Sequence, residues 1–317
     1  MPINPVACIL SQYPVMILDG ALSTELERHG CDLNDPLWSA KILIENPQVI
    51  YQAHYDYFLA GADCVITSSY QASFDGFAKK GFSHQEGVAL LQKSVEVAQK
   101  ARSDFLADNP IAGRPSPLVA ASIGPYGAYL ADGSEYRGYC GVTDEVLKVF
   151  HQERMAVVLE CAADILACET IPSAQEACVL LDLLSRHSGA YAWFSFTLKD
   201  GRHISDGSPL LECVKLLDAS AQVAAIGVNC VDSRYVCEAI SVIRQGTQKP
   251  VVVYPNAGQV YDASLKRWHG NCADKTPGLS QSALQWVERG ARMIGGCCGT
   301  TAADIQKLAG LLRPVNG

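Results

Sequence analysis

The sequence predicts a single (β/α)8 barrel, in which eight parallel strands are each followed by a helical segment, over residues 1–317. Short apolar runs alternate with amphipathic segments along the whole chain, which is typical of parallel strands buried on both faces. The alternation occurs eight times within 317 residues, and this number and length match a barrel. An open doubly wound sheet is the alternative, but that architecture does not require eight repeats.

The elements can be placed in order from these runs. The predicted strands are 15–18, 64–70, 118–123, 165–170, 190–198, 223–230, 251–254 and a last one that ends at Cys297. The clearest predicted helices are 36–60, 85–106 and 144–161, and two more begin with capping-box patterns at Ser173–Glu176 and Thr301–Asp304. In the helix 85–106, apolar residues recur at steps of three and four and define one buried face.

The loops that follow strands are the longest, and they predict the position of the functional site. Loops before strands are mostly short, whereas 124–141, 199–208 and 255–276 follow strands. Active sites of barrels lie at the carboxyl ends of the strands. Polar residues end the predicted strands at Asp19, Thr67, Ser122, Glu169, Asn229, Asn256 and the cysteines discussed next.

Three cysteines stand at the ends of two predicted strands. Cys297 and Cys298 are adjacent and flanked by glycines, and Cys230 ends the apolar run 223–230. Neighbouring side chains on a strand point to opposite faces, so both members of the pair can reach one atom only if the backbone leaves strand geometry there. Three thiolates and one open position are typical of catalytic zinc. Burial as small apolar residues and a vicinal disulfide are the alternatives.

Two carboxylates and several aromatic side chains are further candidates. Asp19 could form an ordinary turn with Gly20, and Glu169 could form an ion pair inside the barrel mouth, but two carboxylates at one mouth would also suit a substrate with an ammonium group. The aromatic residues predicted for the top loops are Tyr126, Tyr129, Tyr136, Tyr139, Tyr254, Tyr261 and Trp268. Aromatic faces attract onium cations, although ordinary loop packing would also explain these residues.

Composition excludes several partner classes. The formal net charge is −8, the pI is about 5.4, and no basic run occurs, which argues against nucleic acid and anionic membranes as partners. No apolar stretch is long enough to span a bilayer. The first residues lack the basic start of a signal peptide, and the 13 cysteines are scattered. We therefore expect a cytoplasmic protein with reduced thiols.

Six short motifs, in order along nearly the whole chain, resemble those of the zinc-dependent homocysteine S-methyltransferase family. They are 18–21 (LDGA), 69–72 (SYQA), 122–129 (SIGPYGAY), 168–170 (CET), 227–230 (GVNC) and 295–300 (GGCCGT). Two further stretches, 35–40 and 132–138, resemble the branch that uses S-methylmethionine. The resemblance implies a zinc ion on Cys230, Cys297 and Cys298 and an enzyme that methylates L-homocysteine to methionine.

The same resemblance implies the substrate site. The homocysteine amino group would lie near Asp19 and Glu169, and Gln71 would be a candidate labile zinc ligand. The expected substrate-binding set is Asp19, Gly20, Gln71, Glu169, Asn229 and Tyr254, with no catalytic residue outside the zinc site. S-methylmethionine is the expected donor, and S-adenosylmethionine as a second donor, selenocysteine as an acceptor and the oligomeric state stay open. The alternatives are a non-enzymatic zinc-binding barrel and a zinc-free barrel lyase or isomerase.

Overall fold

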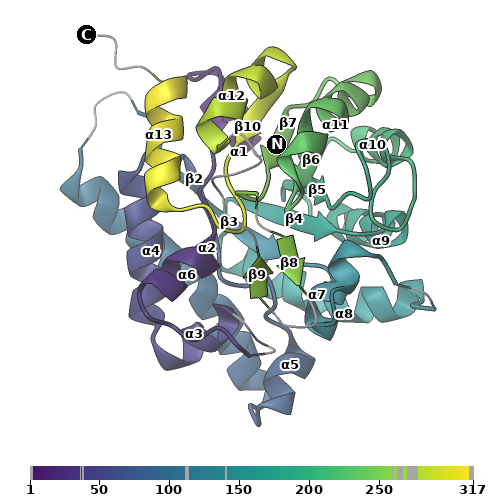
Figure 1. Cartoon of the computed structure of the whole chain (residues 1–317). Coiled ribbons are helices and arrows are strands. Elements are labelled where there is room, and N and C mark those ends of the chain that lie inside the picture. Colours follow the sequence, from purple (N-terminus) through teal and green to yellow (C-terminus); the bar gives the residue numbers. More distant parts are fainter. Residues whose placement is uncertain are drawn as a thin grey trace.

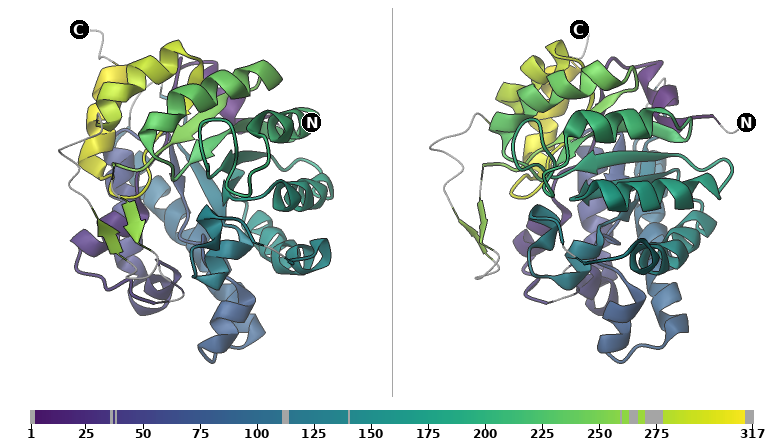
Figure 2. Two further views of the ribbon diagram at one scale, coloured as in Figure 1. Left: turned by 45° about the vertical axis from the view of Figure 1, so that its right-hand side comes forward. Right: turned by 90° about the vertical axis from the view of Figure 1, so that its right-hand side faces the viewer.

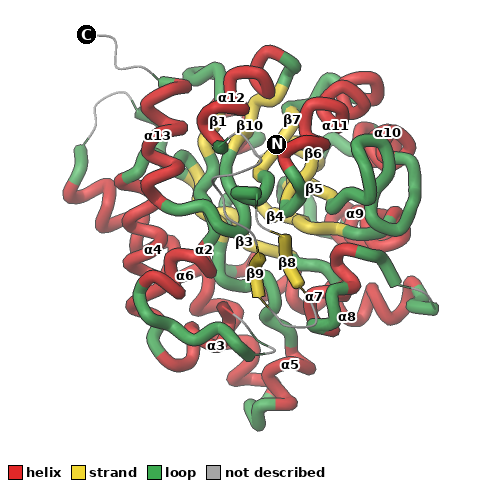
Figure 3. The backbone as a smooth tube through the Cα atoms, viewed as in Figure 1, coloured by secondary structure: helices red, strands yellow, loops and turns green. Residues whose placement is uncertain are grey.

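The structure is a computed structural model that describes residues 3–35, 37, 39–110, 114–139, 141–258, 260–262, 267–269 and 278–313. Eight parallel strands form the centre, and helices surround them (Figures 1 and 3). The strands are β1 (Met16–Ile17), β2 (Cys64–Ile66), β3 (Leu118–Ile123), β4 (Ile165–Ile171), β5 (Ala192–Phe196), β6 (Val223–Asn229), β7 (Val251–Tyr254) and β10 (Ala291–Ile294). Their order in the sheet is β1-β10-β7-β6-β5-β4-β3-β2.

The first and last strands of this order also meet, so the sheet closes into a barrel. A parallel bridge joins Leu18 to Cys64, and the backbone N–H of Asp19 donates to the Cys64 carbonyl at 3.0 Å. Closure leaves no exposed sheet edge. The predicted (β/α)8 barrel is therefore confirmed, and the open-sheet alternative is wrong.

The helices largely follow the predicted segments. They are α1 (Pro5–Leu10), α2 (Leu22–Arg28), α3 (Ser39–Glu45), α4 (Pro47–Leu59), α5 (Phe74–Lys79), α6 (His84–Asp108), α7 (Tyr126–Leu130), α8 (Asp144–Glu160), α9 (Ala174–Ser185), α10 (Leu210–Asp218), α11 (Ser233–Gly246), α12 (Leu279–Glu288) and α13 (Ala302–Leu312). The predicted helix 36–60 is in fact two helices, α3 and α4, because Asn46 and Pro47 interrupt it. Pro47 suits the first turn of α4, where no backbone N–H partner is needed.

One of the two predicted capping boxes is only half correct. At α13 the Thr301 backbone N–H donates to the Asp304 carboxylate at 3.1 Å, as predicted. At α9 the Ser173 hydroxyl accepts from the Glu176 N–H at 3.2 Å. The Glu176 side chain, however, accepts from the Tyr126 N–H at 2.7 Å and pairs with His151 at 2.8 Å. The Glu176 carboxylate therefore binds residues distant in the sequence and not the backbone of Ser173, as a capping box would require.

The buried apolar residues form two clusters, one inside the barrel and one between the barrel and its helices. The inner cluster includes Met16, Trp193 and Met293, and Val6 and Ile9 of α1 belong to it. These two α1 side chains are buried and contribute to the barrel interior from the amino-terminal segment. The barrel interior is therefore a packed core, and a cavity lined by the strand ends lies at its other end.

That other end carries the additional structure. The loop 124–141 contains α7 and the short 3-10 helix η1 (Ser134–Tyr136), and β8 (Val260–Asp262) pairs antiparallel with β9 (Arg267–His269) after β7. This hairpin and the amino-terminal segment lie on opposite sides of the barrel (Figure 2). The side chains of Tyr261 and Trp268, and residues Pro36 and Trp38 of the stretch 35–40, lie outside the described residues. Within the described part of the chain, no helix is long and apolar enough to cross a membrane.

Candidate active site

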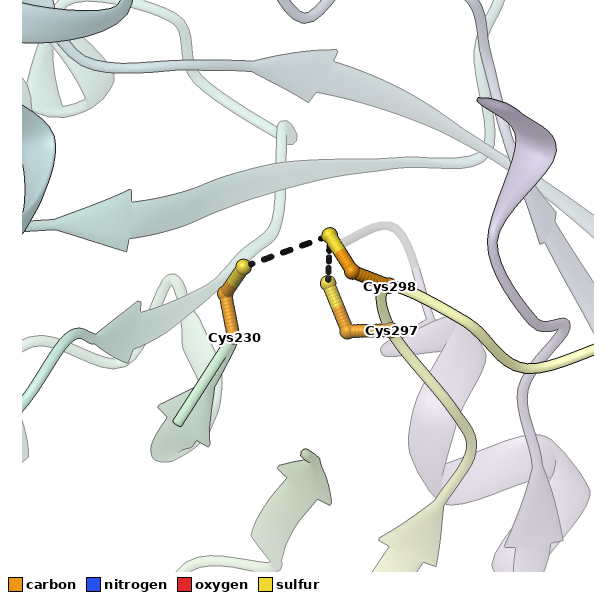
Figure 4. A group of neighbouring side chains, drawn as sticks. All are labelled: Cys230, Cys297 and Cys298. Carbon is orange, nitrogen blue, oxygen red and sulfur yellow. Dashed lines mark hydrogen bonds between the residues drawn. The ribbon is translucent and has the colours of Figure 1, made fainter. Parts of the chain in front are cut away.

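The three predicted cysteines meet at the carboxyl end of the barrel. The Sγ atoms of Cys230 and Cys298 are 3.7 Å apart, and those of Cys297 and Cys298 are 3.9 Å apart. All three sulfur atoms lie within 4.8 Å of one another. Figure 4 shows Cys230 approaching from the end of β6 and the other two from the loop after β10. All three are free thiols, so the vicinal disulfide is absent from this structure.

The backbone leaves strand geometry at Cys297 and Cys298, as predicted, because β10 ends at Ile294 and both cysteines lie in the loop that follows. Cys230 has a φ of 52°, which lies in the left-handed region that non-glycine residues rarely adopt. The glycine before the pair is needed for close packing, because a Cβ atom on Gly296 would lie 2.3 Å from the Thr300 hydroxyl. That hydroxyl donates to the Cys297 carbonyl at 2.6 Å. The short loop is therefore fixed on both sides of Cys297 and Cys298.

A residue of the loop 124–141 completes the surroundings of the thiols. The Tyr136 hydroxyl lies 3.1 Å from Cys230 Sγ. Hydrogen bonds from Cys297 and Cys298, with a further one from Tyr136, lower the pKa of the Cys230 thiol well below its usual value. Sequence reasoning placed Tyr136 in a cation-binding wall and missed its contact with a cysteine, because that contact depends on a 3-10 turn.

Glu169 is buried beside the cysteines, and two hydroxyl groups hold its carboxylate. Ser122 donates to Oε1 at 2.5 Å and Tyr254 donates to Oε2 at 3.1 Å. Burial raises the pKa of Glu169 to about 7, and the two hydroxyl groups partly oppose this rise. Its partners are neutral hydroxyl groups, and among the described residues Glu169 forms no ion pair at the barrel mouth. A cation is the partner that would stabilise the ionised form.

Asn229 orients Glu169 through the residue that follows it. The Asn229 Oδ1 accepts from the Thr170 N–H at 2.7 Å, and its Nδ2 donates to the Thr170 hydroxyl at 2.8 Å. Thr170 has a φ of 61°, which is costly for a β-branched residue. Ser195 also donates to Asn229 Oδ1 at 2.8 Å. Asn229 lines the cavity as predicted, but most of its hydrogen-bonding capacity stabilises this strained turn.

Asp19 and Gly20 follow β1 and line the same cavity. Asp19 Oδ2 accepts from the Ile66 N–H at 2.8 Å. Burial raises the pKa of Asp19 well above its usual value, and the nearby Glu169 charge adds to this rise. A Cβ atom on Gly20 would lie 2.9 Å from the hydroxyl groups of both Thr300 and Tyr57. Gly20 therefore allows the loop after β10 to pack closely against β1.

Gln71 is placed differently from the other predicted site residues. Its Nε2 donates to the Ala128 carbonyl at 2.9 Å, and its Oε1 is buried without a hydrogen-bond partner among the described residues. Gln71 is not among the residues that line the cavity, whereas its neighbour Tyr70 is. Arg154 donates to the carbonyls of Tyr70 and Gly124, each at 3.3 Å, and so joins the segments that carry Gln71 and the loop 124–141.

Three of the six tyrosines expected in a cation-binding wall, Tyr126, Tyr129 and Tyr139, pack elsewhere. Tyr126 lies 5.6 Å from Tyr129 and 6.0 Å from Tyr139 by ring centroids, and 5.1 Å from Phe150. None of these four rings borders the cavity, so loop packing explains them. Tyr70, Tyr136 and Tyr254 are the described tyrosines that line it.

The cavity joins these groups. Asp19, Glu169, Asn229, Tyr254 and the three cysteines all line it. Its volume is about 100 Å³, which suits a small molecule. No Lys, Arg or His is found among its described lining residues, so a cationic ligand would be the partner that stabilises the ionised forms of its two carboxyl groups.

The donor set fits a tetrahedral metal ion. Zinc–sulfur bonds of ~2.3 Å at tetrahedral angles place sulfur atoms ~3.8 Å apart, and the observed separations are 3.7 Å and 3.9 Å. Within the described residues, this is the one group of three or more His, Cys, Asp or Glu side chains arranged for a metal ion. A fourth position is left for a ligand from the cavity.

Comparisons with known proteins agree with this geometry. The family described as Homocysteine S-methyltransferase matches residues 16–312. The homocysteine S-methyltransferase YbgG of Bacillus subtilis is 50% identical over 98% of both chains, and that of Escherichia coli is 49% identical over 96% of this chain and 97% of its own. The crystal structure of the metallated Escherichia coli enzyme MmuM covers 96% of this chain and 99% of its own with a TM-score of 0.87 and 47% identity. The chain therefore belongs to the homocysteine S-methyltransferase family.

Proposed function

We propose that this chain transfers a methyl group from S-methylmethionine to the thiol of L-homocysteine, forming methionine, with zinc held by Cys230, Cys297 and Cys298. The whole chain would act as one homocysteine-binding barrel in the cytoplasm. The observation that carries the proposal is the spacing of the three thiols beside two buried carboxylates in one small cavity. The family to which the chain belongs supports homocysteine as the acceptor, and a metallated relative supports a metal at the cysteines.

A zinc ion bound here would hold the homocysteine sulfur as a thiolate at neutral pH, because a coordinated thiol loses its proton. The protein would align the homocysteine sulfur with the methyl carbon of the donor. The thiolate attacks the methyl carbon, a sulfur–carbon bond forms, and the methyl–sulfonium bond breaks. Its electron pair stays on the donor sulfur, which leaves as a neutral thioether. No proton has to be delivered to the leaving group, which agrees with a cavity without histidine among its described lining.

Asp19 and Glu169 supply the charge for the homocysteine ammonium group in this proposal. Both are buried, and burial raises the pKa of both carboxyl groups. No cationic side chain is found among the described residues that line their cavity. An ammonium group would restore their ionised forms and would be bound by charge-assisted hydrogen bonds. Ser122 and Tyr254 keep the Glu169 oxygens in place for this contact.

The sign of the charge favours a sulfonium donor. The carboxylates and thiols of the lining attract a cation, whereas a folate donor carries carboxylates that would need Lys or Arg partners. Betaine and S-adenosylmethionine are also cations, so charge alone does not separate them. The stretches 35–40 and 132–138, which resemble the S-methylmethionine branch, favour S-methylmethionine.

Two measurements test the proposal. Methionine formation from homocysteine should have its highest kcat/KM with S-methylmethionine when equal concentrations of S-methylmethionine, S-adenosylmethionine, betaine and methyltetrahydrofolate are compared. A higher value with betaine or methyltetrahydrofolate would show that the donor is wrong. If no donor methylates homocysteine, a non-enzymatic zinc-binding barrel becomes the better description.

The metal is tested separately by atomic emission. The protein should contain about one zinc per chain, and Cys230→Ser, Cys297→Ser and Cys298→Ser should each lose it. Cys213→Ser is the matched control, since Cys213 is a buried free cysteine on α10, outside the cavity lining. Full zinc content in the three site variants would contradict the assignment.

A further inference from the structure

Tyr136 belongs to the loop 124–141 and contacts one of the three cysteines of the metal site. Its hydroxyl lies 3.1 Å from Cys230 Sγ, and the residue lines the cavity. The two other described tyrosines in that lining are differently engaged. The Tyr254 hydroxyl is bonded to Glu169, Ser195 and Trp193, and Tyr70 is held by its carbonyl bond to Arg154. The Tyr136 hydroxyl thus contacts a cysteine of the metal site from the cavity lining.

The turn that carries Tyr136 is fixed by the barrel. The Thr197 hydroxyl at the end of β5 donates to the Glu135 carbonyl at 2.8 Å, and the Gly138 N–H donates to the Ser134 carbonyl at 2.8 Å. A Cβ atom on Gly127 would lie 2.7 Å from the Glu135 nitrogen, so α7 packs directly on this turn. The Tyr136 ring is therefore held in place before a ligand arrives, and holding it costs little entropy on binding.

The methyl donor has to enter the part of the cavity that Tyr136 borders. Reacting atoms need to come within ~3–3.5 Å of each other, so the sulfonium must lie close to the homocysteine sulfur beside the cysteines. Glu135 lies on the same turn, and its Oε2 is buried without a hydrogen-bond partner among the described residues. Burial raises the pKa of this carboxyl to about 7, so a cation beside it would stabilise the ionised form. An aromatic ring and a carboxylate on one turn are the groups that attract a sulfonium.

We propose that the Tyr136 ring binds the sulfonium of the methyl donor, and that the hydroxyl bond to Cys230 holds the ring beside the metal site. This inference rests on the proposed function, since it assumes a sulfonium donor. It assigns donor recognition to one tyrosine of the loop 124–141 and assigns Tyr126, Tyr129 and Tyr139 to packing.

The test compares a charged ligand with a neutral one of nearly the same shape. S-methylmethionine and methionine differ by one methyl group and its positive charge. Their affinities for zinc-loaded protein without homocysteine can be measured by isothermal titration calorimetry, with zinc content determined in parallel. In Tyr136→Leu, which removes the ring, S-methylmethionine should bind roughly 3- to 30-fold more weakly, while methionine affinity changes less than about twofold.

Tyr136→Phe separates the ring from the hydroxyl group. It keeps the aromatic face and loses the bond to Cys230, so sulfonium affinity should stay within about threefold of the original protein. Tyr129→Leu is the matched control, because Tyr129 belongs to the same loop but packs on Phe150, and it should leave both affinities unchanged.

The outcomes are distinct. Equal losses of S-methylmethionine and methionine in Tyr136→Leu, or unchanged binding of both, would overturn the role of Tyr136. An equal loss of sulfonium affinity in Tyr129→Leu would do the same, because it would reflect a general disturbance of the loop. Failure of the unmodified protein to use S-methylmethionine in the methylation assay would instead overturn the proposed function, whatever the variants show.

Discussion

Replacing Tyr254 by Phe should weaken homocysteine binding and also destabilise the barrel. The Tyr254 hydroxyl accepts from the Trp193 Nε1–H at 3.1 Å and donates to Glu169 Oε2 at 3.1 Å. It also lies 2.6 Å from the Ser195 hydroxyl. All three partners are buried, and without this hydroxyl the Trp193 N–H loses its acceptor.

The stability cost follows from that lost partner. A buried donor left without an acceptor costs ~1–3 kcal/mol, and a large domain loses ~2–4 °C of Tm per kcal/mol. Scanning calorimetry should therefore show a Tm lower by roughly 2–12 °C. Tyr51→Phe is the control, because Tyr51 also donates to a carboxylate, that of Asp104 at 2.7 Å, but lies far from the site between α4 and α6. A change of under about 1 kcal/mol is expected there.

The kinetic effect has a defined pH dependence. Tyr254 lowers the pKa of Glu169, so its removal raises that pKa above about 7 and protonates more of the carboxylate at neutral pH. The homocysteine KM should rise near pH 7, and the difference from the unmodified enzyme should shrink by pH 8.5, where Glu169 is ionised in both. An unchanged KM at pH 7, or an increase of equal size at pH 8.5, would refute the role given to Glu169.

Three further predictions concern packing and charge. Gly296→Ala should lower zinc content and activity, because its Cβ would lie 2.3 Å from a threonine hydroxyl, whereas Gly310→Ala has nothing within 4 Å and should raise Tm slightly. Desolvation lowers the pKa of buried His54 to about 4, so its imidazole is neutral in the folded protein. The free energy of unfolding should fall by up to about 3 kcal/mol as pH decreases from 6.5 to 4. Urea titrations of His54→Leu should lack this loss. Arg313→Ala should lower the free energy of unfolding by about 3 kcal/mol, because Asp63 is buried and loses its hydrogen bond of 2.7 Å to Arg313. An unchanged Tm would exclude that ion pair as a stabilising contact.

The barrel could be predicted because its signals are local. Eight buried strands give continuous apolar runs, and the helices between them keep their own periodicity. What could not be predicted depends on tertiary contacts. The Thr197 hydroxyl donates to the 3-10 turn Ser134–Tyr136. At the start of α7, the Tyr126 N–H donates to the Glu176 carboxylate. A glycine- and tyrosine-rich loop shows neither contact in its sequence.

The same distinction applies to the site. The three cysteines were predictable because each stands at a strand end, and the ends of parallel strands meet at one face of the barrel. The left-handed backbone of Cys230 and the contact of Tyr136 with its sulfur were not, because both arise from how separate loops pack. Gln71 was predicted from the family resemblance. Its amide nitrogen donates to the Ala128 carbonyl and it does not line the cavity, so its role at the site stays a prediction.

The buried carboxylates differ in the partners that the structure gives them. Glu176 accepts from the Tyr126 N–H, His151 and Tyr139, and Asp63 accepts from Arg313 and the Ile17 N–H. In these cases protein donors bind the carboxylate, and neither residue is among the described residues that line the cavity at the cysteines. Glu169 receives two neutral hydroxyl groups and faces a cavity whose described lining has no cationic side chain. A carboxylate held in place but not neutralised is stable as an anion only when a cation arrives, which is the physical reason to assign it to the substrate ammonium group.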